Sequence, residues 1–166
     1  MSNLSRRNFI IAASASLAGV PAARADGEGT ILSVHGATSK RNNEAWKFKL
    51  AELQAIGREE LQTKTPWDGD ETAYAGISLQ TLYHYVGGFG SILRLAALND
   101  FKSTIPVSDL KQFNPLMAWE RNGKLMPIAE KGPLFIVYPF TQKPELWNEE
   151  VFAKCVWQLA DIEIGD

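Results

Sequence analysis

Four side chains within five residues have the types needed to recognise a flat, polar ligand. Trp67 offers a ring on which another ring can stack, and Asp68, Asp70 and Glu71 follow it closely. A carboxylate can accept two hydrogen bonds from the N–H groups of a heterocycle. The stretch therefore predicts a binding loop. Two structural interpretations remain open, namely that Trp67 covers the core and that the acids form a solvated loop.

A second polar pair, Asn99 and Asp100, interrupts an apolar run. Binding residues are often carried by loops that a rigid sheet holds in place, so the pair is a second candidate. An ordinary turn is the competing interpretation, because both residue types favour turns.

The other reactive side chains form no familiar catalytic or metal-binding motif. Cys155 is the only cysteine, and His35 and His84 are the only histidines. Their spacing fits neither a zinc nor a mononuclear iron motif, and no GxSxG sequence accompanies His84. We expect Cys155 to be a small buried hydrophobic residue.

The first 25 residues resemble a targeting signal. The sequence SRRNFI at residues 5–10 has a twin arginine, an apolar run follows it, and small residues at 23 and 25 suit cleavage. This pattern predicts twin-arginine export to the periplasm; an ordinary secretory signal or a short helix is the alternative. No apolar run reaches the roughly 18–20 residues of a membrane span.

The mature chain is then residues 26–166, and a chain of this length is typical of a single domain. Without Arg6, Arg7 and Arg24, 14 of the 17 basic residues remain against 19 acidic ones, a net charge of −5. There is no basic run, so nucleic acid is not an expected partner.

Hydrophobic periodicity predicts a mixed, β-rich α+β domain. We expect a loop at residues 66–76 and a hairpin that turns at Asn122 and Gly123. Short helices are expected at residues 50–57 and 78–87 and after Pro106. Strands are predicted at residues 30–36, 45–50, 59–65, 91–98, 101–105, 133–140 (as a central strand) and 154–164.

An ordered series of segments resembles the molybdopterin-binding domain of sulfite-oxidase-type enzymes. The segments are GISLQTL from Gly76, then NDF, IPVSDL, MAWERNGKLMPIAEKGPLFIVYP and CVWQLADIEI, and the resemblance covers residues 61–164. In that family one cysteine just upstream of the first segment binds molybdenum. Thr63 or Thr65 occupies that region here, and a hydroxyl does not replace a soft thiolate. Cys155 lies far downstream, on the predicted closing strand.

The resemblance without the cysteine implies a protein that binds a reduced pterin without molybdenum and is not itself an enzyme. Short members of this kind resemble regulators that engage the periplasmic domain of a membrane signalling protein. Trp119 and Tyr138 would lie near the Asn99 pair in that fold. The implied pterin-binding residues are Trp67, Asp70, Glu71, Asn99, Asp100 and Trp119.

Two alternatives stay open. The first is an oxidoreductase that binds a molybdopterin cofactor, or a redox subunit of one. The second is a structural accessory subunit that binds no small molecule.

Overall fold

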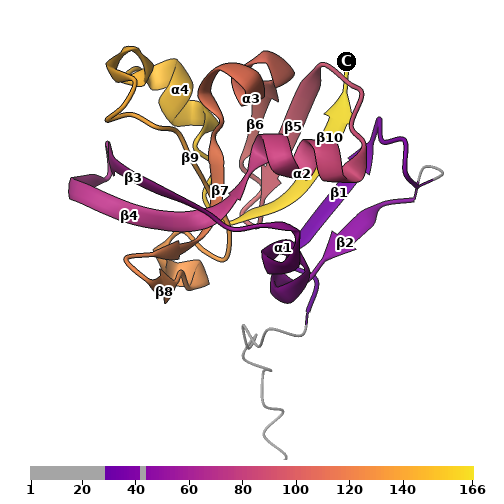
Figure 1. Ribbon diagram of the computed structural model, residues 1–166, viewed down its shortest axis with the longest axis horizontal. Helices are drawn as coiled ribbons and strands as arrows, with labels where there is room; N and C mark the ends of the chain where they lie inside the picture. Colours follow the sequence, from indigo (N-terminus) through magenta and orange to yellow (C-terminus); the bar gives the residue numbers. More distant parts are fainter. Residues whose placement is uncertain (1–28, 42–43) are drawn as a thin grey trace, which may run out of the picture.

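The computed structural model describes residues 29–41 and 44–166, and the expected signal at residues 1–25 lies outside them. The described chain forms two β-sheets that share one hydrophobic core, with short helices around them (Figure 1). Within these residues, no helix is long and apolar enough to cross a membrane.

The first sheet has the strand order β2-β1-β10-β5-β6. Only the β1–β10 pair is parallel. Alternating residues such as Val34, Leu95 and Ile162 are buried, whereas Arg94 on the other face is exposed. The strands are β1 (Leu32–Gly36), β2 (Trp46–Phe48), β5 (Ile92–Ala97), β6 (Lys102–Pro106) and β10 (Leu159–Gly165).

The second sheet is built on a long hairpin, β3–β4, whose tip projects away from the first sheet beside α4 (Figure 1). Strand β7 pairs with β4, β8 and β9. The strands are β3 (Glu59–Thr65), β4 (Asp68–Ser78), β7 (Leu116–Arg121), β8 (Lys124–Leu125) and β9 (Phe135–Val137).

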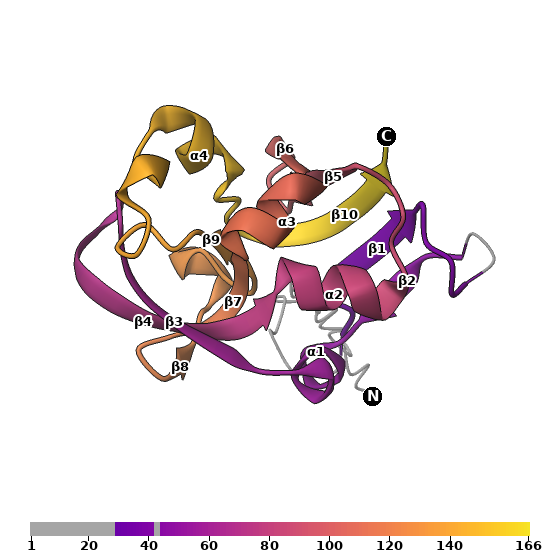
Figure 2. The same ribbon diagram turned by 45° about the horizontal axis from the view of Figure 1, so that its top comes forward.

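Helix α2 packs on the buried face of the first sheet, and α3 lies next to it (Figure 2). The hydroxyl of Ser78 accepts a hydrogen bond from the Thr81 N–H at the start of α2, and Gly87 ends the helix at a φ of 68°. The helices are α1 (Leu50–Ile56), α2 (Leu79–Val86), α3 (Val107–Phe113) and α4 (Glu149–Lys154), with short 3₁₀ turns at Ile128–Glu130 and Pro144–Leu146.

The predicted α+β class and most of the predicted elements are confirmed. Strand β3 has the predicted bounds, and the β7–β8 hairpin turns at Asn122 and Gly123. Both turn residues have positive φ, 50° and 74°, as this tight turn requires.

Three predictions of local structure were wrong. The expected loop at residues 66–76 is mostly strand β4, because pairing with β3 and β7 overrides its Gly and Asp content. The segment at residues 133–140 contains only a three-residue strand that pairs with β7 alone; it is buried because the chain around Val156 covers its other side. The closing strand begins at Leu159, and Cys155 follows α4 instead of lying on the strand.

Candidate functional site

An aromatic pocket of about 250 Å³ lies where three separate parts of the chain meet. They are the β3–β4 hairpin tip, the β5–β6 turn, and the end of α4 with the segment that precedes β10. The pocket is lined by Trp67, Asn99, Phe101, Phe152, Cys155 and Trp157.

Two tryptophans form one wall of the pocket. The rings of Trp67 and Trp157 meet edge to face, with centroids 5.4 Å apart and an interplanar angle of 84°. Trp67 also meets Phe152 edge to face at 6.1 Å. Trp67 is 37% exposed and Trp157 is 39% exposed, so both rings keep surface available for a ligand. Trp157 falls within the strand predicted at residues 154–164, but β10 starts two residues after it and its side chain is exposed.

The β5–β6 turn contributes one polar group and one more ring. The Asn99 Oδ1 atom accepts a hydrogen bond from the Phe101 N–H at 3.2 Å, which leaves the amide NH₂ group of Asn99 as a donor. Asp100 lies between them at a φ of 65°. The turn is anchored to the tryptophan wall, because the Leu98 N–H donates to the Gln158 carbonyl at 2.9 Å.

Cys155 lines the pocket but remains mostly buried. Its thiol lies 3.5 Å from the Val151 carbonyl, and burial raises the pKa of Cys155 to about 12. At neutral pH it is therefore a protonated thiol, neither a nucleophile nor a metal-binding thiolate. The prediction that it is a buried residue is confirmed.

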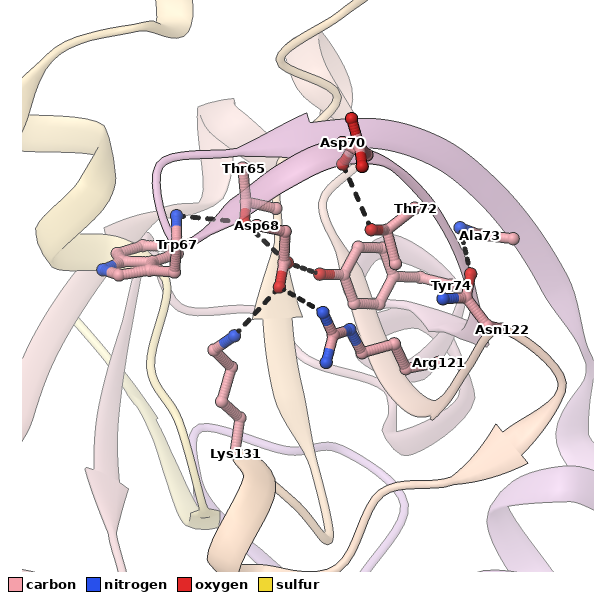
Figure 3. Close-up of polar contacts among 10 residues, drawn as sticks. All are labelled: Thr65, Trp67, Asp68, Asp70, Thr72, Ala73, Tyr74, Arg121, Asn122 and Lys131. Atoms are coloured by element: carbon pink, nitrogen blue, oxygen red, sulfur yellow. Dashed lines mark hydrogen bonds and ion pairs between the residues drawn. The ribbon is translucent and has the colours of Figure 1, made fainter.

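A charged cluster centred on Asp68, the first residue of β4, lies next to the hairpin tip (Figure 3). The Asp68 side chain is 3% exposed and accepts hydrogen bonds from the Thr65 hydroxyl at 2.8 Å and from the Tyr74 hydroxyl. Arg121 Nη2 lies 2.6 Å from Asp68 Oδ1, and Lys131 Nζ lies 3.3 Å from the same oxygen. All four partners are donors, so the buried carboxylate is fully compensated.

These contacts set the charge state of the cluster. Burial by itself would raise the pKa of Asp68, but the hydrogen bonds from Tyr74 and Thr65 and the charge of Lys131 outweigh it and lower that pKa. Burial and the neighbouring carboxylate raise the pKa of Tyr74. Asp68 is therefore a charged structural acceptor, and it does not line the pocket.

The two threonines in the region of the expected molybdenum-binding cysteine do not fit that role. Thr63 is buried, and its hydroxyl accepts a hydrogen bond from the Thr141 N–H at 2.9 Å. Thr65 is buried and donates to Asp68. Within the described residues, no group of three His, Cys, Asp or Glu side chains could hold a metal ion.

The structure brings together only part of the residue set suggested by the sequence. Trp67 and Asn99 line the pocket, and Asp100 is exposed beside it. Asp70 and Glu71 are exposed on β4, and Figure 3 shows Asp70 apart from the Asp68 contacts. Trp119 is 1% exposed, so neither of its ring faces is open to a ligand.

Sequence reasoning missed Phe101, Phe152 and Trp157 as pocket residues. Phe152 lies on α4, a helix of six residues that is not among the helices expected from the sequence. The Asn148 side chain, which accepts a hydrogen bond from the Val151 N–H, is the N-cap signal that indicates this helix. For Trp157 and Phe101, the only local sequence signal of a pocket residue is that each is an aromatic residue next to a turn.

The fold is shared with a known oxidoreductase. No protein-family model matches the chain, and no curated protein matches it. Among solved structures, the chain is similar to the sulfane dehydrogenase SoxCD from Paracoccus pantotrophus, with a TM-score of 0.62 and 16% identity. The similarity covers 84% of this chain and 39% of that chain. It shows a common α+β fold.

Proposed function

We propose that this protein binds a pterin in the aromatic pocket and does not itself catalyse a reaction. The observation that carries the proposal is that the rings of Trp67, Trp157 and Phe101 line one pocket together with Asn99, whose Oδ1 atom accepts from the Phe101 N–H and whose NH₂ group is left as a donor. A flat ring would stack on the indoles, and the Asn99 NH₂ group would donate to a carbonyl on the edge of that ring.

The size and charge of the pocket support a small neutral ligand. Its volume of about 250 Å³ is below the roughly 300–1,000 Å³ of sites for drug-sized ligands, which suits a two-ring heterocycle. None of the lining residues in the described part of the chain is charged, so an anionic phosphate would lose its hydration without gaining a partner there. A bare pterin fits this environment better than a complete molybdopterin.

The same lining supports a binding role over a catalytic one. General acid–base catalysis needs a group whose pKa lies near the working pH. Among the described residues that line the pocket, Cys155 is the only titratable one, and its pKa is raised to about 12.

A regulatory role follows as part of the proposal. We propose that the mature chain acts in the periplasm and passes the presence of the pterin to the periplasmic domain of a membrane signalling protein. A molybdenum-cofactor oxidoreductase, or a subunit of one, is the second candidate, and the similarity to a sulfane dehydrogenase favours it.

Calorimetric titration of residues 26–166 with 6-methyltetrahydropterin under anaerobic conditions tests the proposal. We expect one site in the wild type. Asn99→Asp keeps the oxygen that accepts from Phe101 but removes the donor, and it should weaken binding about tenfold. Asp100→Asn is the matched control in the same turn and should bind like the wild type.

Elemental analysis separates the two candidates. Protein exported by its native host should carry no stoichiometric molybdenum. One molybdenum atom per chain would overturn the non-catalytic proposal and favour the oxidoreductase. Failure of both oxidised and reduced pterins to bind would favour the accessory subunit.

A further inference from the structure

The two indole rings of the pocket come from distant parts of the sequence. Contacts between these two segments must therefore fix the relative orientation of the rings. Trp67 directly precedes Asp68 at the hairpin tip, whereas Trp157 lies before β10. The side chain of Lys131 lies between these two segments.

Lys131 contacts both the hairpin tip that carries Trp67 and the segment that carries Trp157. Its Nζ atom is 3.3 Å from Asp68 Oδ1 and 5.3 Å from the centroid of the Trp157 ring. It is also 5.9 Å from the centroid of Phe135, which itself meets Trp67 and Trp157 edge to face. The side chain is 14% exposed, so these cation–π contacts are partly desolvated and therefore stronger than at the surface.

The backbone of Lys131 adds a second link to the same wall. Its carbonyl accepts a hydrogen bond from the Gln158 N–H at 2.9 Å, directly after Trp157. Lys131 and Gln158 both adopt positive φ, 73° and 53°, so both segments turn sharply where they meet.

Lys131 is not the only cation that compensates the charge of Asp68. Arg121 lies closer to the carboxylate, at 2.6 Å against 3.3 Å, and the hydroxyls of Thr65 and Tyr74 complete its hydrogen bonding. The ammonium group thus shares the compensation of Asp68 with Arg121, and it is the only charged group placed over the Trp157 ring among the described residues.

We infer that Lys131 is a positioning residue for the aromatic pocket: its ammonium group holds Trp157 edge to face against Trp67 by bridging Asp68 and the Trp157 ring. Its effect on the pair of indoles is independent of any ligand. Its effect on affinity rests on the proposed function.

The test uses the circular dichroism of the indole pair, because two indoles in contact couple their electronic transitions. Trp157→Phe first identifies the signal that belongs to this pair. Lys131→Met keeps the length of the side chain but removes the charge, and it should abolish most of that signal. Lys131→Arg retains a cation and should restore it.

The matched control is Lys143→Met. Lys143 Nζ lies 5.7 Å from the Phe113 ring, so this variant also removes a cation over an aromatic ring, but away from the pocket. The indole signal should be unchanged. Binding of 6-methyltetrahydropterin should weaken roughly 3- to 30-fold in Lys131→Met and remain normal in the control.

The outcomes are distinguishable. An unchanged indole signal in Lys131→Met, with or without a lower melting temperature, would overturn the positioning role. Loss of the signal in a protein whose wild type binds no pterin would retain the positioning role and reject the proposed function. If Lys131→Met does not fold, wild-type NMR decides: the ring current of Trp157 should shift the Lys131 ε-protons upfield, and normal shifts would overturn the inference.

Discussion

Two aromatic hollows of the same volume, about 250 Å³ each, lie on this protein, and they differ in chemistry. The first is the pocket of Trp67 and Trp157. The second lies beside β2 and α1, and its residues include Trp46 and Tyr85. Trp46 is stacked on Phe48 with an interplanar angle of 8°, and the Arg41 guanidinium lies 4.4 Å from the Trp46 ring centroid.

Volume alone does not distinguish a ligand site from a surface hollow in this protein. In the second hollow the Trp46 ring is already in contact with Phe48 and Arg41. Charged residues also line this hollow. In the first pocket the rings of Trp67 and Trp157 meet edge to face, and the Asn99 NH₂ group is left as a donor. No charged side chain of the described residues lines this pocket. Available ring faces and an uncommitted polar group are the features that favour binding.

The largest expected difference concerns thiol reactivity. Because the pKa of Cys155 is raised from its ordinary value of 9.0 to about 12, its thiolate fraction at neutral pH falls about 1,000-fold. Ala55→Cys places a reference thiol at the second hollow, where the residue is exposed. Mass spectrometry should show maleimide on the introduced cysteine long before Cys155 reacts. Equal rates would mean that the pocket does not bury its thiol.

The next effect concerns stability. Asp68→Ala leaves Arg121 and Lys131 without their buried carboxylate and should lower the free energy of unfolding by about 3–5 kcal/mol. Glu52→Ala at the second hollow removes only an exposed contact to the Lys49 N–H and should cost about 1 kcal/mol or less. Urea denaturation measures both. Similar losses would contradict the structural difference between the two regions.

Substitution of the tryptophans should then separate the two regions in binding. Trp67→Ala or Trp157→Ala removes a stacking surface and should weaken affinity for 6-methyltetrahydropterin about 10- to 100-fold. Trp46→Ala should leave the dissociation constant unchanged. Calorimetry measures all three, and a loss of affinity confined to Trp46→Ala would assign the ligand to the other hollow.

The smallest effect is a dependence of stability on pH. The pKa of Asp68 is lowered from 3.8 in the folded state, so its ionised form stabilises the fold above that value. This contribution is lost as the pH falls through the folded-state pKa. Between about pH 5 and pH 2, the free energy of unfolding should therefore fall more steeply in the wild type than in Asp68→Asn. Parallel curves would argue against an ionised Asp68.

Elements defined by local signals were predictable from the sequence. Ser78 and Gly87 mark the ends of α2, and Asn122 with Gly123 marks the β7–β8 turn. The pocket depends instead on long-range contacts. Trp157 alternates with Leu159 like a strand residue, yet the positive φ of Gln158 separates it from β10 and leaves it exposed.

The sequence predicted only those residues of the candidate site whose type alone suggests binding. Trp67 and Asn99 stood out by type, and both line the pocket. Asp70 and Glu71 looked like partners of Trp67 because they are close in sequence, but strand geometry carries them along β4, outside the pocket lining. Trp119 looked available, but it is enclosed in the core.

The most direct test of the central claim is an NMR titration that observes the indole N–H signals of all five tryptophans. Adding 6-methyltetrahydropterin to residues 26–166 should shift the Trp67 and Trp157 signals in a saturable way and leave that of Trp46 in place. A shift of the Trp46 signal alone, or no shift in any of the five, would contradict the assignment of a pterin to the aromatic pocket.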